Sequence, residues 1–446
     1  TNLTRADLSR ANLFNVNLTN SNLNKASLVN ANLKGVVLEN TILREANLSS
    51  TDLSGQDLSG KDLLKTDFSE ADLSNADLSN AKLIKTKLNR ANLENTNLKN
   101  ADFKETILRG VDLSNRDLSG VSFSRTDLSY SKFKNTNLSK VNFKKANLSH
   151  VDFSGADIAK ANFRDAIWEN SNLSNTDLTK VTIDINEIPK MKIKGANLSS
   201  LVFLGMDFSG VDLSNANLSK CSFTSANLQN ANLEGANLKG AIFIGADLGG
   251  ANLLNTKLPK NNLSGINLCR ADLRNQDFSN QNLSGAKLSQ ANLAGANLSN
   301  TTLLEVNLTD ANLEGVDLSN ANLSKAHLIH VNFKNANLKN ANLSNASLVR
   351  ANFENANLEN ANLSRGKLTK TNFKNANLEN AVLKLANAKD TCFIEANLNG
   401  ANLSSADLSS ADFHKAMMIG ADLYKANLWH ADLWETNLTK ANLIKA

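Results

Sequence analysis

Histidine and cysteine are the residues of this 446-residue chain best suited to metal binding or nucleophilic chemistry, and both are rare. His327 and His330 lie close together, but no carboxylate or thiol accompanies them to complete a zinc site. Serine and aspartate recur so often that a Ser-His-Asp combination carries no information, and no phosphate-binding loop is present. We therefore expect a protein that is not an enzyme and has no catalytic residue, no metal site and no cofactor.

Every fifth residue from Leu3 to Leu443 is large and apolar, with Ala388 as the one exception among 89 central positions. The stretch ANFENANLENANLSR at residues 351–365 shows the whole pentad: a small residue lies two before the centre, Asn or Asp lies between them, and two polar residues follow. A period of five fits neither a helix nor a long alternating strand. It predicts a solenoid, in which each repeat buries its apolar face only by stacking on its neighbours.

Phenylalanine positions indicate how many pentads make one coil. Two ladders of central phenylalanines recur at intervals of twenty residues, one starting at Phe103 and the other running from Phe333 to Phe413. Residues that stack in adjacent coils lie on the same face, so four pentads make one coil.

The last residue of each pentad predicts the geometry of the corner. In the pentads in phase with Leu13 this residue is Asn or Gly as far as Asn375, whereas in those in phase with Leu3 it seldom is. Asn and Gly tolerate a left-handed backbone, so we expect a turn with positive φ at the Leu13 corner. The other corners need not share that geometry.

The motif resembles the A(D/N)LXX signature of the pentapeptide repeat family, and the resemblance covers the entire chain. It implies an all-β fold, a right-handed quadrilateral β-helix in which the central residue and the small residue two before it point inward. With strands about 4.8 Å apart, about 22 coils of four pentads would form a rod about 105 Å long. We expect residues 1–446 to form a single domain.

Residues 181–195 depart most from the repeat. Pro189 has no backbone N–H, and Asn186 and Met191 occupy positions that are usually small, so we expect a local bulge or kink that leaves the register intact. A hinge or a notch for a partner is the alternative. Polar residues occupy small inward positions further along the chain, at Asn261, Gln276 and Gln281.

Cysteines and glycosylation tripeptides bear on the compartment. Cys221, Cys269 and Cys392 are many coils apart, so a disulfide within one solenoid is excluded and a reducing compartment is favoured. The tripeptides NLS and NLT recur on every face as formal N-glycosylation acceptors. We expect a cytoplasmic protein without a signal peptide or a transmembrane segment. Because the repeats begin at Thr1, we also expect that an initiator methionine has been lost or omitted. The ends of the solenoid are expected either to be capped by segments absent from this sequence or to be occupied by other molecules.

Charge is distributed unevenly around the coil, although the chain carries a formal net charge of only +5. In the first third of the chain the face in phase with Leu3 is basic, while over the whole chain the face in phase with Leu13 is acidic. The basic face is formed by Lys61, Lys65, Lys82, Lys85, Lys104, Arg125, Lys144, Lys145 and Arg164. It is a candidate surface for an anionic partner, and a solvated face is the simpler interpretation.

The last repeats carry large apolar residues at the outward position just after the centre. This aromatic girdle consists of Ile419, Tyr424, Trp429, Trp434 and Ile444. Exposed apolar surface usually marks a contact, so we expect a partner surface here, unless a cap covers it.

Three functions remain open. The first is a rigid structural or protein-interaction scaffold, with head-to-tail stacking of identical rods into a filament as one form of it. The second, implied by the family resemblance, is DNA mimicry that binds a type II topoisomerase, although mimicry favours a more acidic chain than this one. The third is electrostatic binding of nucleic acid or another anionic surface by the basic face, which is disfavoured because that stretch lacks interleaved aromatic residues.

Overall fold

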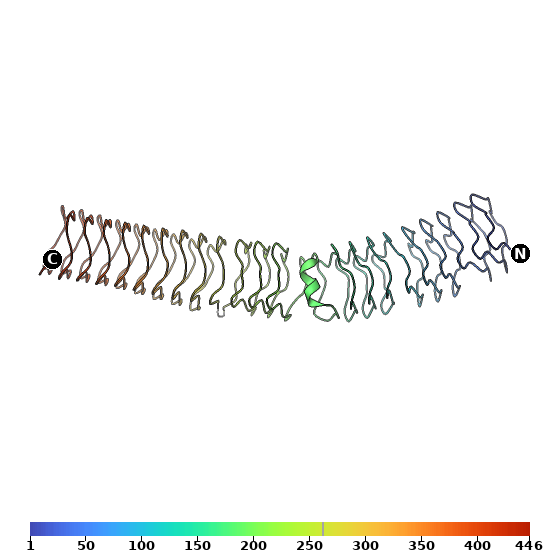
Figure 1. Ribbon diagram of the computed structural model, residues 1–446, viewed down its shortest axis with the longest axis horizontal. Coiled ribbons are helices and arrows are strands. Elements are labelled where there is room, and N and C mark those ends of the chain that lie inside the picture. Colours follow the sequence, from blue (N-terminus) through green and yellow to red (C-terminus); the bar gives the residue numbers. More distant parts are fainter. Residues whose placement is uncertain (261–262) are drawn as a thin grey trace. The chain divides into compact units, whose positions relative to one another are not determined.

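The computed structural model describes residues 1–260 and 263–446 of the chain. Its contacts divide the chain into two compact units, and both are built from the same repeating coil (Figure 1). Unit 1 comprises Thr1–Leu198 and Asn215–Asn217, and unit 2 comprises Ser199–Ser214 and Leu218–Ala446. The expectation that residues 1–446 form a single domain stays a prediction.

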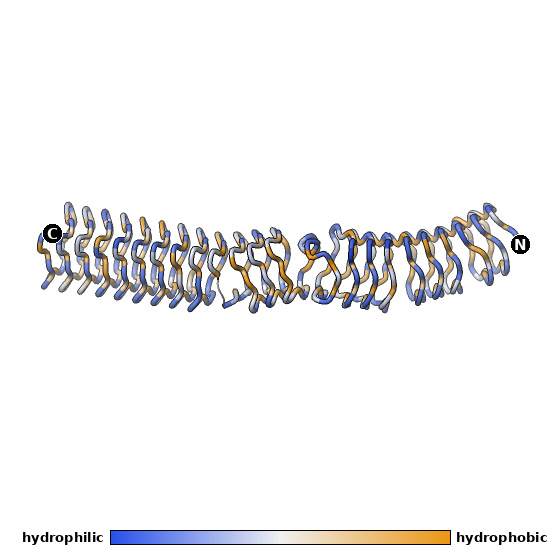
Figure 2. The backbone as a smooth tube through the Cα atoms, turned by 60° about the horizontal axis from the view of Figure 1, so that its bottom comes forward, coloured by the Kyte–Doolittle hydropathy of each residue, from blue (hydrophilic) through white to orange (hydrophobic). Residues whose placement is uncertain are grey.

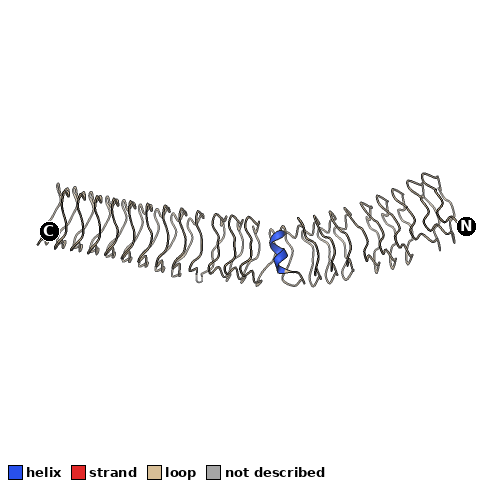
Figure 3. Ribbon diagram, in the orientation of Figure 1, coloured by secondary structure: helices blue, strands red, loops and turns tan. Residues whose placement is uncertain are grey.

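Most adjacent coils are held together by parallel backbone pairing between residues twenty apart, although in unit 1 this pairing is missing between residues 32–42 and 52–62 and between residues 92–102 and 112–122. The second residue of a pentad pairs with its counterpart one coil later, as Asn352 does with Asn372, and such pairs occur on all four faces. The N–H of the central residue also donates to the next coil, with 2.7 Å between the nitrogen of Phe353 and the carbonyl oxygen of Asn372. The four-pentad coil expected from the sequence is therefore confirmed. Each pairing is a single bridge, so a short helix is the one regular element drawn in the described chain (Figure 3).

Two residues of each pentad point inward and fill the coil, while the others face solvent, which makes polar and apolar residues alternate along the tube in both units (Figure 2). The expected phenylalanine ladders are confirmed. The ring of Phe373 is fully buried and stacks between Phe353 and Phe393, with centroid distances of 5.0 and 5.2 Å. The core is thus a column of stacked side chains.

The chain turns at the end of each pentad through a residue with a left-handed backbone. At Leu363–Gly366 the N–H of Gly366 donates to the carbonyl of Leu363 at 3.1 Å, and Arg365 has a φ of 57°. Positive φ at the third residue of a hydrogen-bonded turn is the type II geometry. The side chain of Asn362 supports it by accepting from the N–H of Ser364 at 3.0 Å, which explains why Asn and Asp occupy this position.

This turn corrects the expectation that the corners could differ. Arg365 lies at the Leu3 corner and Asn375, with a φ of 58°, lies at the Leu13 corner, yet both have the same backbone. Charged residues such as Lys25 and Glu105 adopt it as well. A left-handed conformation costs a non-glycine residue roughly 1–2 kcal/mol, so Asn and Gly ease the turn wherever they occur.

Residues 181–195 interrupt the coil in unit 1 with helix η1, a 3₁₀ helix at Ile185–Lys190 (Figure 3). Asp184 caps it by accepting from the N–H of Asn186 at 3.0 Å, and Asn186 is exposed instead of lying in the core. Pairing resumes at once, because Lys192 pairs with Asn172. The expected local departure with intact register is confirmed.

Many polar side chains at the small inward position donate to the same recurring acceptor, the carbonyl of the central residue 23 positions earlier. The hydroxyl of Thr86 donates to the carbonyl of Leu63, 23 residues earlier, at 2.9 Å, and the ammonium of Lys61 donates in the same way to Leu38 at 2.8 Å. Burial lowers the pKa of Lys61, because the charged form loses solvation. Of the three polar intrusions expected further along, Gln276 is half-buried, Gln281 is buried, and Asn261 lies outside the described residues.

The Phe373→Ala substitution should create a cavity in the middle of a phenylalanine ladder. We expect it to lower the local free energy of opening by about 3 to 5 kcal/mol, measured by native-state hydrogen exchange of the amides in that coil and its neighbours. Lys374→Ala, an exposed neighbour, is the control and should leave exchange unchanged. Equal protection in the two variants would contradict the inward ladder.

The Lys61→Thr substitution should stabilise unit 1, because threonine makes the same bond to the preceding coil without burying a charge. We expect a gain of less than about 1 kcal/mol in the free energy of unfolding, since the ammonium is still partly solvated. The gain should be largest below the lowered pKa of Lys61 and should vanish as the pH rises past the ordinary value of 10.5, where the amine is neutral in both states. Urea unfolding at neutral and alkaline pH measures it; Lys82→Thr is the exposed control, and a loss of stability would refute this account.

Candidate functional site

The groups capable of metal or nucleophilic chemistry stay apart in the structure. Among the described residues, no group of three or more His, Cys, Asp or Glu side chains could hold a metal ion, and none of the three cysteines forms a disulfide. Burial raises the pKa of the Cys221 thiol to about 11, so it is protonated and unreactive at neutral pH. Nδ1 of His330 donates to the carboxylate of Asp310 at 3.1 Å, one coil away, and no third metal-ligating side chain joins this pair in the described part of the chain.

The basic face retains less free charge than the sequence indicates. Lys61 is half-buried with its ammonium bonded to a backbone carbonyl. Lys85 and Arg125 approach the carboxylate of Glu105 from opposite sides, at 3.4 and 3.8 Å. Lys144 is half-buried. The remaining five side chains are exposed and have no ion pair within the described part of the chain: Lys65, Lys82, Lys104, Lys145 and Arg164.

The aromatic girdle is exposed in unit 2. Trp429, Trp434 and Ile444 are 66%, 58% and 63% exposed, whereas Ile419 and Tyr424 are half-buried.

Neighbouring side chains hold the indole rings of the girdle. The ring of Trp434 stacks on His414 with centroids 4.2 Å apart, and the ammonium of Lys415 lies 6.0 Å from its centre. Trp429 packs edge-on against His430 at 4.1 Å. These contacts restrict the rings without covering them, so the girdle presents oriented aromatic surface.

Two features were not foreseen from the repeat. Tyr130, which is 55% exposed, stacks on His150 in the next coil with centroids 4.5 Å apart. In unit 2 the backbone pairing between adjacent coils is interrupted near Pro259, beside a groove of about 1380 Å³. A signal for the second feature existed, because the only two prolines of the chain, Pro189 and Pro259, occupy the same position of their pentads.

No helix in the described ranges is long and apolar enough to cross a membrane.

Sequence comparison matches pentapeptide repeat models along most of the chain. The model of the pentapeptide repeat region matches residues 114–183, 306–383 and 367–443. The model described as pentapeptide repeats in eight copies matches residues 1–40, 46–83, 76–115, 193–224, 207–243, 221–258, 243–275 and 277–309. No curated protein matches the chain significantly.

Several solved structures are similar to parts of the chain. HetL, a pentapeptide repeat protein involved in heterocyst differentiation regulation from the cyanobacterium Nostoc sp. strain PCC 7120, is 34% identical over 40% of this chain and 87% of its own, with a TM-score of 0.21. A pentapeptide repeat protein from the Arabidopsis thaliana thylakoid lumen is 28% identical over 31% of this chain and 70% of its own, with a TM-score of 0.12. Full-length QnrB1, a plasmid-mediated fluoroquinolone resistance protein, is 17% identical over 61% of this chain and 91% of its own, with a TM-score of 0.14.

The repeat models and the backbone geometry agree. Pentads stack in register at intervals of twenty residues, with the central residue and the small residue before it buried, as the family resemblance implied. The expected fold, a right-handed quadrilateral β-helix, is confirmed, and the chain belongs to the pentapeptide repeat family.

Proposed function

We propose that this chain is a non-enzymatic scaffold that binds a protein partner through the aromatic girdle. The observation that carries the proposal is the exposure of Trp429 and Trp434, each more than half accessible to solvent. Tryptophan is enriched among the residues that dominate binding energy at protein interfaces. Pentapeptide repeat proteins are generally structural or binding proteins, which supports the same role.

The solenoid supports a scaffold role through the way it orients side chains. The stacking of Trp434 on His414 already limits the rotation of the indole ring. A ring ordered before binding loses less conformational entropy when a partner covers it. The free cysteines are compatible with a reducing, cytoplasmic setting, which remains part of the proposal.

Head-to-tail association of identical chains is a second form of the scaffold proposal. DNA mimicry of a type II topoisomerase substrate is less favoured, because a mimic must replace phosphate charge and the net charge here is +5.

Replacing Trp429 and Trp434 together by alanine should abolish partner binding while the fold persists. Cross-linking from the girdle of the full chain, followed by affinity measurement with the captured protein, should show a loss of about tenfold or more in affinity. The matched control is Tyr130→Ala, which removes an exposed ring from unit 1 and should leave affinity unchanged. Equal affinity of the double variant and the wild type would refute the girdle. Light scattering of the wild type and of the double variant, each over a range of concentrations, tests whether the chain associates with itself.

The five unpaired cations of the basic face favour one further candidate, binding of nucleic acid or another polyanion. Lys82→Glu combined with Lys145→Glu should lower the affinity for heparin and for single-stranded DNA, and wild-type affinity should fall steeply with salt. Position 145 has a φ of 60°, a conformation that Glu105 also adopts, so the variant should fold. Lys374→Glu in unit 2 is the charge-matched control. Affinity that does not depend on salt or on the reversed charges would eliminate this candidate.

A further inference from the structure

Unit 2 contains a groove at a place where the ladder between adjacent coils is interrupted. Residues 253–260 line it, together with residues 236–240, 272 and 274–277 from the coils on either side. Its volume is about 1380 Å³, which exceeds the range of most small-molecule pockets. We call it the ladder groove.

The local sequence departs from the repeat at the interruption. The pentad Thr256–Lys260 reads TKLPK, so Pro259 has no N–H for the side-chain bond that supports the regular turn, and Lys257 has no oxygen to accept it. Pro259 is buried, although this pentad position normally faces outward, and Lys260 is not among the residues with positive φ. Leu258 nevertheless stays in the core. The outer part of this pentad has therefore left the repeat geometry while its centre remains anchored.

The interruption leaves strand edges without their usual partners. On the coil before the groove, the N–H groups of Leu253 and Asn255 donate to no acceptor among the described residues, although the regular pattern directs them to the carbonyls of Asp272 and Arg274. The same holds for Leu238 N–H one face away. One coil earlier, the residues equivalent to Leu253, Asn255 and Leu238 all donate their N–H groups to the expected carbonyls. The N–H groups of Asp272 and Asp277 also donate to no acceptor within the described part of the chain, so both sides of the groove offer backbone donors and carbonyl acceptors.

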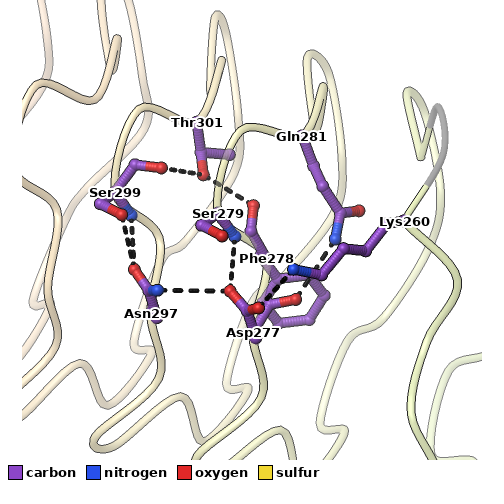
Figure 4. Close-up of polar contacts among 8 residues, drawn as sticks. All are labelled: Lys260, Asp277, Phe278, Ser279, Gln281, Asn297, Ser299 and Thr301. Atoms are coloured by element: carbon purple, nitrogen blue, oxygen red, sulfur yellow. Dashed lines mark hydrogen bonds and ion pairs between the residues drawn. The ribbon is translucent and has the colours of Figure 1, made fainter.

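Side chains replace part of the missing backbone pairing. The amide of Gln276 donates to the carbonyl of Thr256 at 2.8 Å, where the backbone N–H of Asp277 would do so in a regular coil. The ammonium of Lys260 reaches the Asp277 carboxylate at 2.5 Å, and the same carboxylate accepts from the N–H of Ser279 (Figure 4). The bond from Lys260 and then those from Ser279 lower the pKa of Asp277 to about 2, so this bridge persists at neutral pH.

We propose that the ladder groove binds an extended acidic peptide of a partner protein as an added strand. The peptide carbonyls accept from the N–H groups of Leu253 and Asn255, and its own N–H groups donate to the carbonyls of Asp272 and Arg274. This is the pairing that most coils make with their neighbours, and strand addition to an open edge is a common mode of peptide recognition. A bound strand exchanges the hydrogen bonds that these groups make with water for backbone pairing, and each such bond contributes modestly to the binding energy.

The charges around the ladder groove select the acidic side chains. Lys239 and Lys257 are exposed and have no ion pair in the described ranges. The two lining carboxylates are already occupied, Asp272 by Arg274 at 2.6 Å and Asp277 by Lys260. Unused charge in the groove is therefore positive. The side chain of Leu254, which is 53% exposed, offers an apolar contact beside it.

Repair of the pentad provides the first test. The Lys257→Asn and Pro259→Thr substitutions together produce TNLTK, the regular pentad found at residues 436–440, and should restore the ladder and close the groove. The probe is a fluorescein-labelled, end-capped peptide of alternating glutamate and valine, titrated into the full chain and followed by anisotropy. We expect the repaired protein to bind about tenfold or more weakly than the wild type, because several backbone bonds are lost. Lys367→Asn, the same charge loss at a regular coil of unit 2, should bind as the wild type does.

Backbone pairing and charge selection are tested separately. The same peptide N-methylated at alternate amides should lose binding, as should a peptide with lysine in place of glutamate. Hydrogen exchange at Leu253 and Asn255 should slow when the unmodified peptide is bound. The inference is overturned if the wild type fails to bind the glutamate-valine peptide, if the repaired protein binds it equally well, or if N-methylation has no effect. None of these peptide-binding tests involves Trp429 or Trp434, so they can fail or succeed independently of the test of the aromatic girdle.

Discussion

The structure depends on one constraint: the backbone must turn after every fifth residue while each coil stays in register with the next. A type II turn with a left-handed fifth residue meets it, and the Asn or Asp side chain at the second position supports the turn. The cost of positive φ at residues such as Arg365 recurs throughout both units. Backbone bonds to both neighbouring coils, together with the stacked core, offset it, so the turn is stable only within the ladder.

The ladder determines which substitutions the interior tolerates. A polar group at the small inward position is accepted if it reaches the carbonyl 23 residues earlier, as Thr86 and Lys61 do. A threonine does this without charge, whereas the lysine retains a partly desolvated ammonium. The regular surface follows from the same geometry, because outward residues of adjacent coils lie one strand spacing apart. Internal pairs such as Lys85 with Glu105 then neutralise part of any charged face.

The two prolines show that one local change has two different structural results. Both remove the N–H that supports the turn, yet Pro189 lies within helix η1 while Pro259 lies at an open groove. Near Pro189, Asp184 caps the helix and gives the displaced backbone local partners. Near Pro259, the side chains of Gln276 and Lys260 make the links between coils instead. A break in a solenoid thus becomes either a closed irregularity or an accessible edge, according to the side chains around it.

The sequence by itself determined the coil, because a period of five combined with phenylalanines twenty apart permits only one stacking arrangement. It also located the irregular segment at 181–195 and the exposed Trp429 and Trp434, since outward positions follow directly from the period. Only the tertiary structure decided how each cation is used. Lys61 turns toward a carbonyl and Lys85 toward a carboxylate one coil away, and such choices depend on side-chain reach across coils and not on position in the pentad. The groove beside Pro259 also required the structure, because whether a missing turn closes or opens depends on contacts between coils that the period does not encode.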